Sequence, residues 1–368
     1  MKTKLALVLL LTIISLLATP TTAQQVRGQI NFPDILGYKT LKCDLHMHTV
    51  FSDAAVWPTV RVDEALREGL DAISITDHIE YHPHKQDIPI NHNRPYQIAQ
   101  PAAQKRNILL IMGAEITRDT PPGHFNAIFL QDINPLDVND LTEAIKAANQ
   151  QNAFVFWNHP GWKPEAKEWV DIHTTLCENK LLKGIEVANG DDYYPEAHKW
   201  CLEKNLTMMG NSDIHSPAEN QQTMPDKHRT MTLVFAKDKT IDAIKEALLA
   251  GRTAVWFQNQ LIGSKKYLEA IFKAAVQIKQ PTSRHEGKAW FEITNNSAID
   301  IELQRTGRKG SPSLTLPAND TITVKVKTKN GQRKVNLPYL ATNFLIAPGE
   351  GLPVDLTILL GGASSVNR

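Results

Sequence analysis

Histidine and carboxylate side chains occur close together near residue 50. The segment "CDLHMHTVFSDA" (residues 43–54) places His46 and His48 one residue apart, with Asp53 shortly after them. Side chains alternate along an extended strand, so the two imidazoles point to the same side. Imidazole and carboxylate without thiolate are typical of zinc, manganese or iron sites with open positions, not of closed structural zinc sites. The segment therefore predicts part of a reactive metal centre.

Five later segments carry residues of the same types beside apolar runs that resemble strands. They are "ITDH" (75–78), "GAE" (113–115), "GHF" (123–125), "NHP" (158–160) and "SDIH" (212–215). In a barrel of alternating strands and helices, the C-terminal ends of the strands meet on one face. We therefore expect six separated parts of the chain to meet at one site. Two or three ions held there can generate hydroxide from water and stabilise phosphate oxygens during displacement.

The elements that position these residues have the pattern of an α/β protein. From about residue 41, short apolar runs such as "AISIT" (72–76) and "AFVFWN" (153–158) alternate with segments of helical periodicity such as "TIDAIKEALLAG" (240–251). Repeated strand–helix units predict a parallel sheet or barrel with crossover helices. This domain is expected to span residues 24–262.

The pattern changes after about Gly263. A short helical stretch leads into segments of period-two alternation, among them "TITVKVK" (321–327), and Asn330-Gly331 is a turn signal. Residues 263–368 are therefore predicted to form an antiparallel, β-sandwich-like module without catalytic groups.

The N-terminus has the features of a secretion signal. "MKTK" is basic, "LALVLLLTIISLLA" is apolar, and "TPTTA" supplies small residues before Gln24. We expect cleavage after Ala23 and a periplasmic or secreted mature protein without a membrane anchor; an uncleaved anchor is the alternative.

Charge and cysteine content narrow the class of protein. A formal net charge of +1, without a long run of like charge, gives no reason to expect an obligate nucleic-acid partner. The three cysteines exclude a disulfide-rich scaffold. Cys177 and Cys201 could pair, but spacing does not decide this, and Cys43 is expected to be a small buried residue.

Together, "DLHMHTVFSD", "ITDH", "GAE", "GHFNAIFL", "NHP" and "SDIH" resemble the PHP family, named for polymerase and histidinol phosphatase, over residues 40–257. The resemblance implies a distorted (β/α)7 barrel with a cluster of two or three divalent ions (zinc, manganese or iron). The implied ligands are His46, His48, Asp53, His78, Glu115, His124, His159, Asp213 and His215. All of these except His124 are also expected to take part in catalysis.

Residues around the ligands are candidates for supporting roles. Asp44 and Asp77 could hold metal-bound histidines, since such rings commonly donate their other nitrogen to a carboxylate; a backbone hydrogen bond is the alternative for Asp44. Arg118 and Arg229 are candidate phosphate-binding residues, because guanidinium matches phosphate geometry. The loop "HIEYHPHKQDIPINHNRPY" (78–96) could act as a lid or be a solvated connection.

The sequence thus favours an exported metal-dependent phosphoesterase that acts on a small phosphate ester. The layout resembles exported phosphodiesterases of the family, so diester hydrolysis is expected. A phosphomonoesterase, a metal-dependent hydrolase of another ester or amide, and a non-catalytic binding module are the alternatives.

Overall fold

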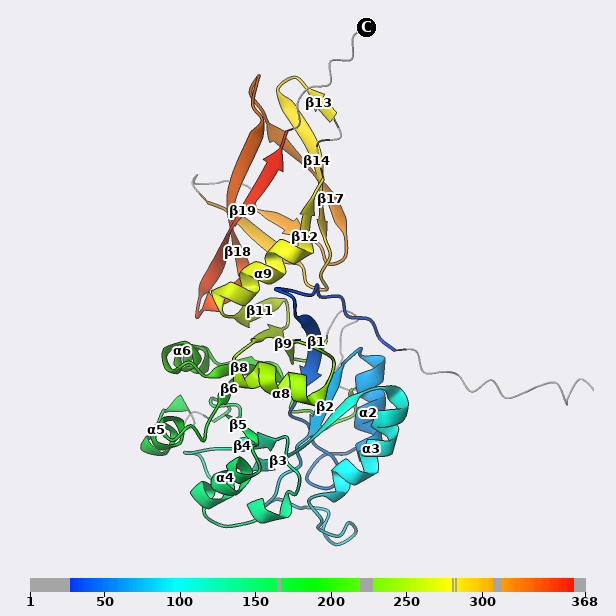
Figure 1. Ribbon diagram of the computed structural model, residues 1–368, viewed down its shortest axis with the longest axis vertical. Coiled ribbons are helices and arrows are strands. Elements are labelled where there is room, and N and C mark those ends of the chain that lie inside the picture. The colour runs from blue at the N-terminus through cyan, green and yellow to red at the C-terminus, as the bar shows by residue number, and fades with distance from the viewer. Residues whose placement is uncertain are drawn as a thin grey trace, which may run out of the picture.

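The computed structural model describes residues 27–163, 167–218, 228–279, 281, 283–306 and 313–360. The predicted signal peptide, residues 1–23, lies outside these ranges. Figure 1 shows a barrel with surrounding helices in the lower half and a β-rich module in the upper half, with helix α9 at the junction. The fold is the predicted one: a distorted (β/α)7 barrel followed by an antiparallel module.

Seven strands form the barrel. They are β1 (Lys39–Asp44), β2 (Ala72–Ile75), β3 (Leu109–Ile116), β4 (Phe125–Ile128), β5 (Phe154–Trp157), β6 (Gly184–Asn189) and β8 (Thr207–Asn211). Strands β1–β2–β3 are parallel, as are β5–β6–β8, but β4 is antiparallel to both β3 and β5. The pairing departs from parallel at β4, because residues 117–124 contain no helix and are too few for a crossover connection.

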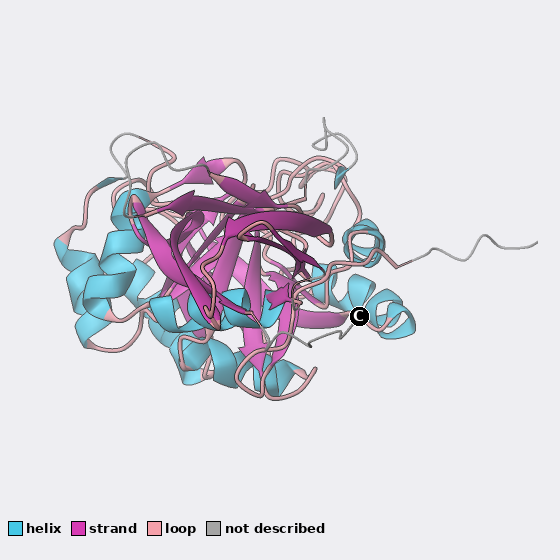
Figure 2. Ribbon diagram, turned by 90° about the horizontal axis from the view of Figure 1, so that it is seen from above, coloured by secondary structure: helices cyan, strands magenta, loops and turns pink. Residues whose placement is uncertain are grey.

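Helices follow most barrel strands. They are α2 (Pro58–Arg67), α3 (Arg94–Arg106), α4 (Leu141–Gln150), α5 (Asp171–Glu178), α6 (Pro195–Lys204) and α8 (Ile241–Leu249), with a 3₁₀ turn η1 (Asn134–Leu136). Helix α4 shows why they form: the Asp140 side chain caps its start by accepting from the Glu143 N–H (2.9 Å). Its buried residues Ala144, Ile145 and Ala148 lie on one face, which packs on the sheet. Figure 2 shows the strands at the centre and the helices along the sides.

The barrel closes where β1 meets β8. The Leu45 N–H donates to the Asn211 side chain (2.8 Å), and Met47 forms a parallel bridge with Ile214. Gly210 lets β8 lie close against the Val255 side chain, since a Cβ at position 210 would lie 2.2 Å from that side chain. The closure brings the residues that follow β1 and β8 together at one edge.

The sheet continues beyond the barrel. Strands β9 (Met231–Ala236), β10 (Thr253–Phe257) and β11 (Gln260–Gly263) extend it antiparallel from β1, and a short hairpin strand β7 (Asp192–Tyr193) follows β6. Strand β11 then pairs in parallel with β18 of the C-terminal module, with Leu261 opposite Phe344. Barrel and module therefore share a continuous sheet and one apolar cluster.

The C-terminal module is a sandwich of two antiparallel sheets behind helix α9 (Lys265–Ala275). One sheet contains β12 (Val276–Ile278), β13 (Ser283–His285), β14 (Lys288–Asn295) and β17 (Thr321–Lys327). The other contains β15 (Ile301–Arg305), β16 (Leu314–Leu316), β18 (Lys334–Ala347) and β19 (Glu350–Leu359). The predicted antiparallel module is confirmed, and its strand β18 continues the sheet of the barrel.

None of the three cysteines forms a disulfide. Cys177 and Cys201 are both free thiols, so the disulfide that the sequence left open does not form; Cys201 lies buried, whereas Cys177 on α5 is partly exposed. Cys43 is buried in β1, as expected. Among the described residues, none of the helices combines the length and the apolar character needed to cross a lipid bilayer.

Candidate metal centre

The structure brings the nine predicted ligands together at one edge of the barrel. His46 and His48 follow β1, His78 follows β2, Glu115 lies near the end of β3, His159 follows β5, and Asp213 and His215 follow β8. His124 directly precedes β4, and the start of this antiparallel strand lies at the same edge as the ends of its neighbours. The nine residues form four overlapping sets, and within each set the ligand atoms lie within 4.8 Å of one another.

Glu115 connects two of these sets. Its Oε2 lies 3.3 Å from His46 Nε2 and 3.2 Å from His48 Nε2. Its Oε1 lies 2.9 Å from His124 Nδ1. The two oxygens of one fully buried carboxylate thus face different imidazoles, so Glu115 would serve as a ligand in both of these sets when metal is bound.

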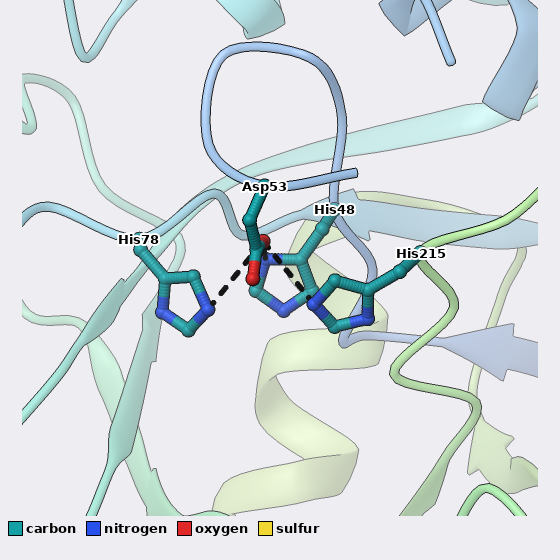
Figure 3. Close-up of side chains that lie close together, drawn as sticks. All are labelled: His48, Asp53, His78 and His215. Carbon is teal, nitrogen blue, oxygen red and sulfur yellow. Dashed lines mark ion pairs between the residues drawn. The ribbon is translucent and has the colours of Figure 1, made fainter. Parts of the chain in front are cut away.

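Asp53 joins a third group of rings (Figure 3). Its Oδ1 lies 3.2 Å from His215 Nε2 and 3.7 Å from His78 Nε2, and the ring of His48 lies between those two histidines. The loop that carries Asp53 leaves β1 and turns back over the edge of the barrel. This third group does not include Glu115, but it shares His48 and His78 with the other sets.

Two of the ligands occupy unusual backbone conformations. His159 has φ +28° and Asp213 has φ +51°, a region that residues with a Cβ rarely adopt. The Asp213 N–H is held by the His46 carbonyl (2.9 Å), and the His159 N–H by Glu186 (2.8 Å). Such strain is typical of functional sites, where surrounding contacts hold a side chain in a required position.

The donor set fits divalent cations. The oxygens Asp53 Oδ1 and Asp213 Oδ1 are buried and accept no hydrogen bond, although imidazole nitrogens lie 3.0–3.2 Å away. Buried carboxylate oxygens without a partner are costly, and a cation between them and the imidazoles removes that cost. The residues therefore fit the metal cluster that their types predict.

The charges of the site perturb its pKa values strongly. Burial alone would lower the pKa of His48, but the adjacent carboxylates of Asp213 and Glu115 raise it to about 9. Burial would raise the pKa of Asp53, but His215 and His78 lower it to about 2. Burial lowers the pKa of His78 to about 4, even though Glu115 acts in the opposite direction. The carboxylates thus remain ionised and attract cations to the cluster.

Glu186 on β6 holds one of the candidate ligands in place, and it was not predicted from the sequence. It is fully buried, and its Oε1 lies 2.9 Å from His46 Nδ1. Since an ionised carboxylate has no proton to donate, His46 Nδ1–H is the donor, and Nε2 is left with its lone pair toward the cluster. A glutamate inside the buried strand "GIEVAN" was the signal that could have revealed it.

We predict that Glu186→Gln weakens metal binding by about 10- to 100-fold, the usual effect of losing a group that orients a metal ligand. The NH₂ group of the new glutamine cannot accept a hydrogen bond, but it would face donors. In the wild type, Glu186 accepts from the His159 N–H and from the side chains of Asn189 and Asn211. Competition with a chromophoric chelator measures the affinity. Glu196→Gln, an exposed position on α6, is the matched control. Equal metal affinity in the two variants would contradict the assignment.

Asp77 and Asp44 support the site indirectly. Asp77 accepts from the Ser52 hydroxyl (2.7 Å), and the Ser52 oxygen lies 3.3 Å from His48 Nδ1, so Asp77 orients His48 through Ser52. Asp44 accepts from the backbone N–H and the hydroxyl of Ser212, next to the ligand Asp213. The backbone alternative for Asp44 is therefore the one observed.

The two arginines expected to bind phosphate are engaged elsewhere. Arg118 pairs with Glu80 and donates to the carbonyls of Thr117 and Val138. Arg229 is buried in ion pairs with Asp44 (2.9 Å) and Glu68 (2.6 Å). The structure does not support a phosphate-binding role for either arginine, because both guanidinium groups are paired with carboxylates distant in the sequence.

The loop after His78 contributes one residue to the site. The ring nitrogens of His82 face the carbonyls of Phe51 and Ile79, whereas His84 and Lys85 are exposed. Tyr81 instead reaches a cavity of about 400 Å³ beside the cluster. The residues that line this cavity are Asp53, His78, Tyr81, Glu115, Thr117, His124, His159, Trp162, Asn189, Asp192, Tyr194, Asp213 and His215.

Known proteins resemble both parts of the chain. The model of the PHP domain matches residues 44–211, and an Ig-like domain model matches residues 276–357. None of the curated proteins is similar to the chain at a significant level.

Among solved structures, a two-domain protein from Bacteroides vulgatus that contains a predicted PHP-like metal-dependent phosphoesterase is 47% identical. The match covers 91% of this chain and 100% of that one, with a TM-score of 0.87. The lesion-specific endonuclease PfuEndoQ from Pyrococcus furiosus is 14% identical (TM-score 0.40; 67% of this chain and 64% of that one). An amidohydrolase from Chromobacterium violaceum is 17% identical (TM-score 0.36; 48% and 88%). The last two likenesses are too weak to bear on activity.

The first of these structures is similar over almost the whole chain, and the PHP model matches the part of the barrel that carries seven of the nine candidate ligands, His46 to His159. The chain belongs to the PHP family of metal-dependent phosphoesterases.

Proposed function

We propose that the protein is an exported phosphodiesterase that hydrolyses a small phosphate diester with two or three divalent ions. The observation that supports this best is the set of nine imidazole and carboxylate ligands, arranged in four overlapping groups beside an open cavity. Zinc, manganese and iron all suit such a mixed donor set. The predicted signal peptide supports a periplasmic or secreted location.

The chain's own residues hold the reacting groups in place. Bound divalent ions would supply Lewis acidity and a nucleophile derived from water at neutral pH. Glu115 holds two parts of the cluster at a fixed separation, and Asn158 orients it by donating to Oε1 (3.0 Å). Glu186 and Ser52 fix the tautomers of His46 and His48, so that Nε2 of both rings faces the cluster. These contacts organise the site before substrate binds, which is the condition for strong electrostatic catalysis.

The charge of the cavity favours a diester over a monoester. Among the described residues that line it, none is lysine or arginine, and Asp192 adds a carboxylate at its wall. Negative charge on a substrate would therefore be balanced by the ions alone. A diester carries one negative charge near neutral pH, whereas a monoester carries nearly two, and the described cavity wall offers no lysine or arginine side chain to balance the second charge.

The test is hydrolysis of bis(p-nitrophenyl) phosphate and p-nitrophenyl phosphate by protein lacking residues 1–23, loaded with manganese or zinc. We expect metal-dependent turnover of both esters, abolished by EDTA and restored by added metal, with the higher kcat/KM for the diester. Glu178→Gln, an exposed position at the end of α5, is the control for activity. Preference for the monoester would reject diester hydrolysis, and absence of turnover with either ester would reject the proposal as a whole.

A further inference from the structure

Two large aromatic side chains stand exposed at the metal cavity. Tyr81 is 53% exposed and Trp162 is 46% exposed, and both line the cavity. The Tyr81 ring lies 6.2 Å from the ring of His78, and the Trp162 ring lies 5.7 Å from those of His124 and His159. Exposed aromatic groups beside concave sites are characteristic of ligand-binding surfaces.

The backbone holds Trp162 close to the ligands. Its N–H donates to the His159 carbonyl (3.2 Å), which closes a tight turn directly after that ligand. At Gly161 a Cβ would lie 2.7 Å from the Tyr194 ring, so only glycine lets this turn lie against Tyr194. The Lys163 ammonium lies 4.3 Å from the centre of the Trp162 ring, a cation–π contact that fixes the ring further.

Tyr81 comes from a different part of the barrel but reaches the same rim. It follows β2, whereas Trp162 follows β5, and their neighbours His78 and His124 contact one another with ring centres 5.9 Å apart. The two exposed aromatic rings therefore border the side of the cluster where the rings of His78 and His124 meet. An ester group that extends from a phosphate at the cluster toward this side would enter the cavity that both rings line.

We propose that Tyr81 and Trp162 form a subsite for an aromatic ring carried by the phosphate ester. This inference rests on the proposed function and defines its substrate class: a diester with one negative charge and at least one aromatic ester group. Aromatic pairs contribute about 0.5–1.5 kcal/mol beyond burial, which corresponds to roughly a 2- to 10-fold change in affinity.

Two diesters with the same leaving group test the subsite. Bis(p-nitrophenyl) phosphate and methyl p-nitrophenyl phosphate both carry one negative charge and release p-nitrophenolate, but only the first retains an aromatic ring. The measured quantity is kcat/KM for bis(p-nitrophenyl) phosphate divided by kcat/KM for methyl p-nitrophenyl phosphate. Differences in intrinsic reactivity cancel when this ratio is compared between proteins. We expect Trp162→Ala and Tyr81→Ala each to lower the ratio by about 3- to 10-fold.

Trp57→Ala is the matched control, because Trp57 is 45% exposed but does not line the cavity. Its ratio is expected to equal that of the wild type. A ratio that stays unchanged in both cavity variants, with turnover intact, would overturn the subsite and leave the proposed function standing.

Binding provides a readout that does not depend on turnover. By titration calorimetry on metal-loaded protein, diphenyl phosphate is expected to bind about 10-fold more tightly than dimethyl phosphate, and Trp162→Ala is expected to remove most of this difference. Equal affinity of the two compounds for the wild type would overturn the inference. If none of the diesters were hydrolysed, the proposed function would fail, and the binding comparison would still decide whether the aromatic subsite exists.

Discussion

Glu115→Gln is expected to lower kcat/KM for bis(p-nitrophenyl) phosphate by about 10³-fold or more, equivalent to roughly 4 kcal/mol of transition-state stabilisation. Oε2 of Glu115 faces His46 and His48, and Oε1 faces His124. The substitution replaces one of these oxygens with an NH₂ group, which cannot bind a cation. The variant should therefore lose at least one ion as well as its activity.

Elemental analysis of the dialysed protein measures the metal content, and circular dichroism checks the fold. Glu178→Gln should match the wild type in metal content and activity. A Glu115→Gln variant with full metal content and near wild-type turnover would show that this carboxylate does not bridge the cluster.

Arg229→Met is expected to lower the free energy of unfolding by about 3–5 kcal/mol, because it leaves a buried carboxylate without its partner. Arg229 pairs with Asp44, which is fully buried, and with Glu68. Burial would lower the pKa of Arg229, but Glu68 and Asp44 raise it above its ordinary value, so the guanidinium stays charged. Denaturant unfolding with EDTA in every sample measures the loss without a contribution from metal binding.

The same variant separates a structural role from a role in phosphate binding. If Arg229 only stabilises the fold, KM stays within a few-fold of the wild type below the unfolding transition. If Arg229 binds the substrate phosphate, KM rises strongly at nearly unchanged stability, and the structural assignment is wrong. Arg94→Met on α3 is exposed and should change stability by no more than about 0.5 kcal/mol.

The sequence predicted which side chains meet at the site because each lies beside a strand, where local spacing determines direction. For His46 and His48, the alternation of side chains along a strand was sufficient to predict that they point to the same side. Their Nε2 atoms lie 3.1 Å apart. The antiparallel placement of β4 did not follow from its apolar pattern; it depends on the length of the connection that precedes it.

The supporting residues were harder to predict because their partners are distant in the sequence. Glu186 meets His46 across 140 positions, and Arg229 meets Asp44 across 185. A buried strand with a single glutamate, or an arginine beside a strand, does not reveal which group faces it. Close packing in the folded barrel determines these pairs, so sequence spacing alone assigned Arg118 and Arg229 to phosphate and overlooked Glu186.

The parallel pairing of β11 with β18 has a consequence for biosynthesis. Strand β11, which contains Leu261 and Ile262, is synthesised long before its partner residues Phe344 and Leu345 leave the ribosome. During that interval the sheet ends in unpaired N–H and C=O groups next to apolar side chains, which other chains can join. Pairing with β18 thus removes an exposed edge of the sheet. Premature termination within the module would leave β11 unpaired and would produce chains prone to associate with one another.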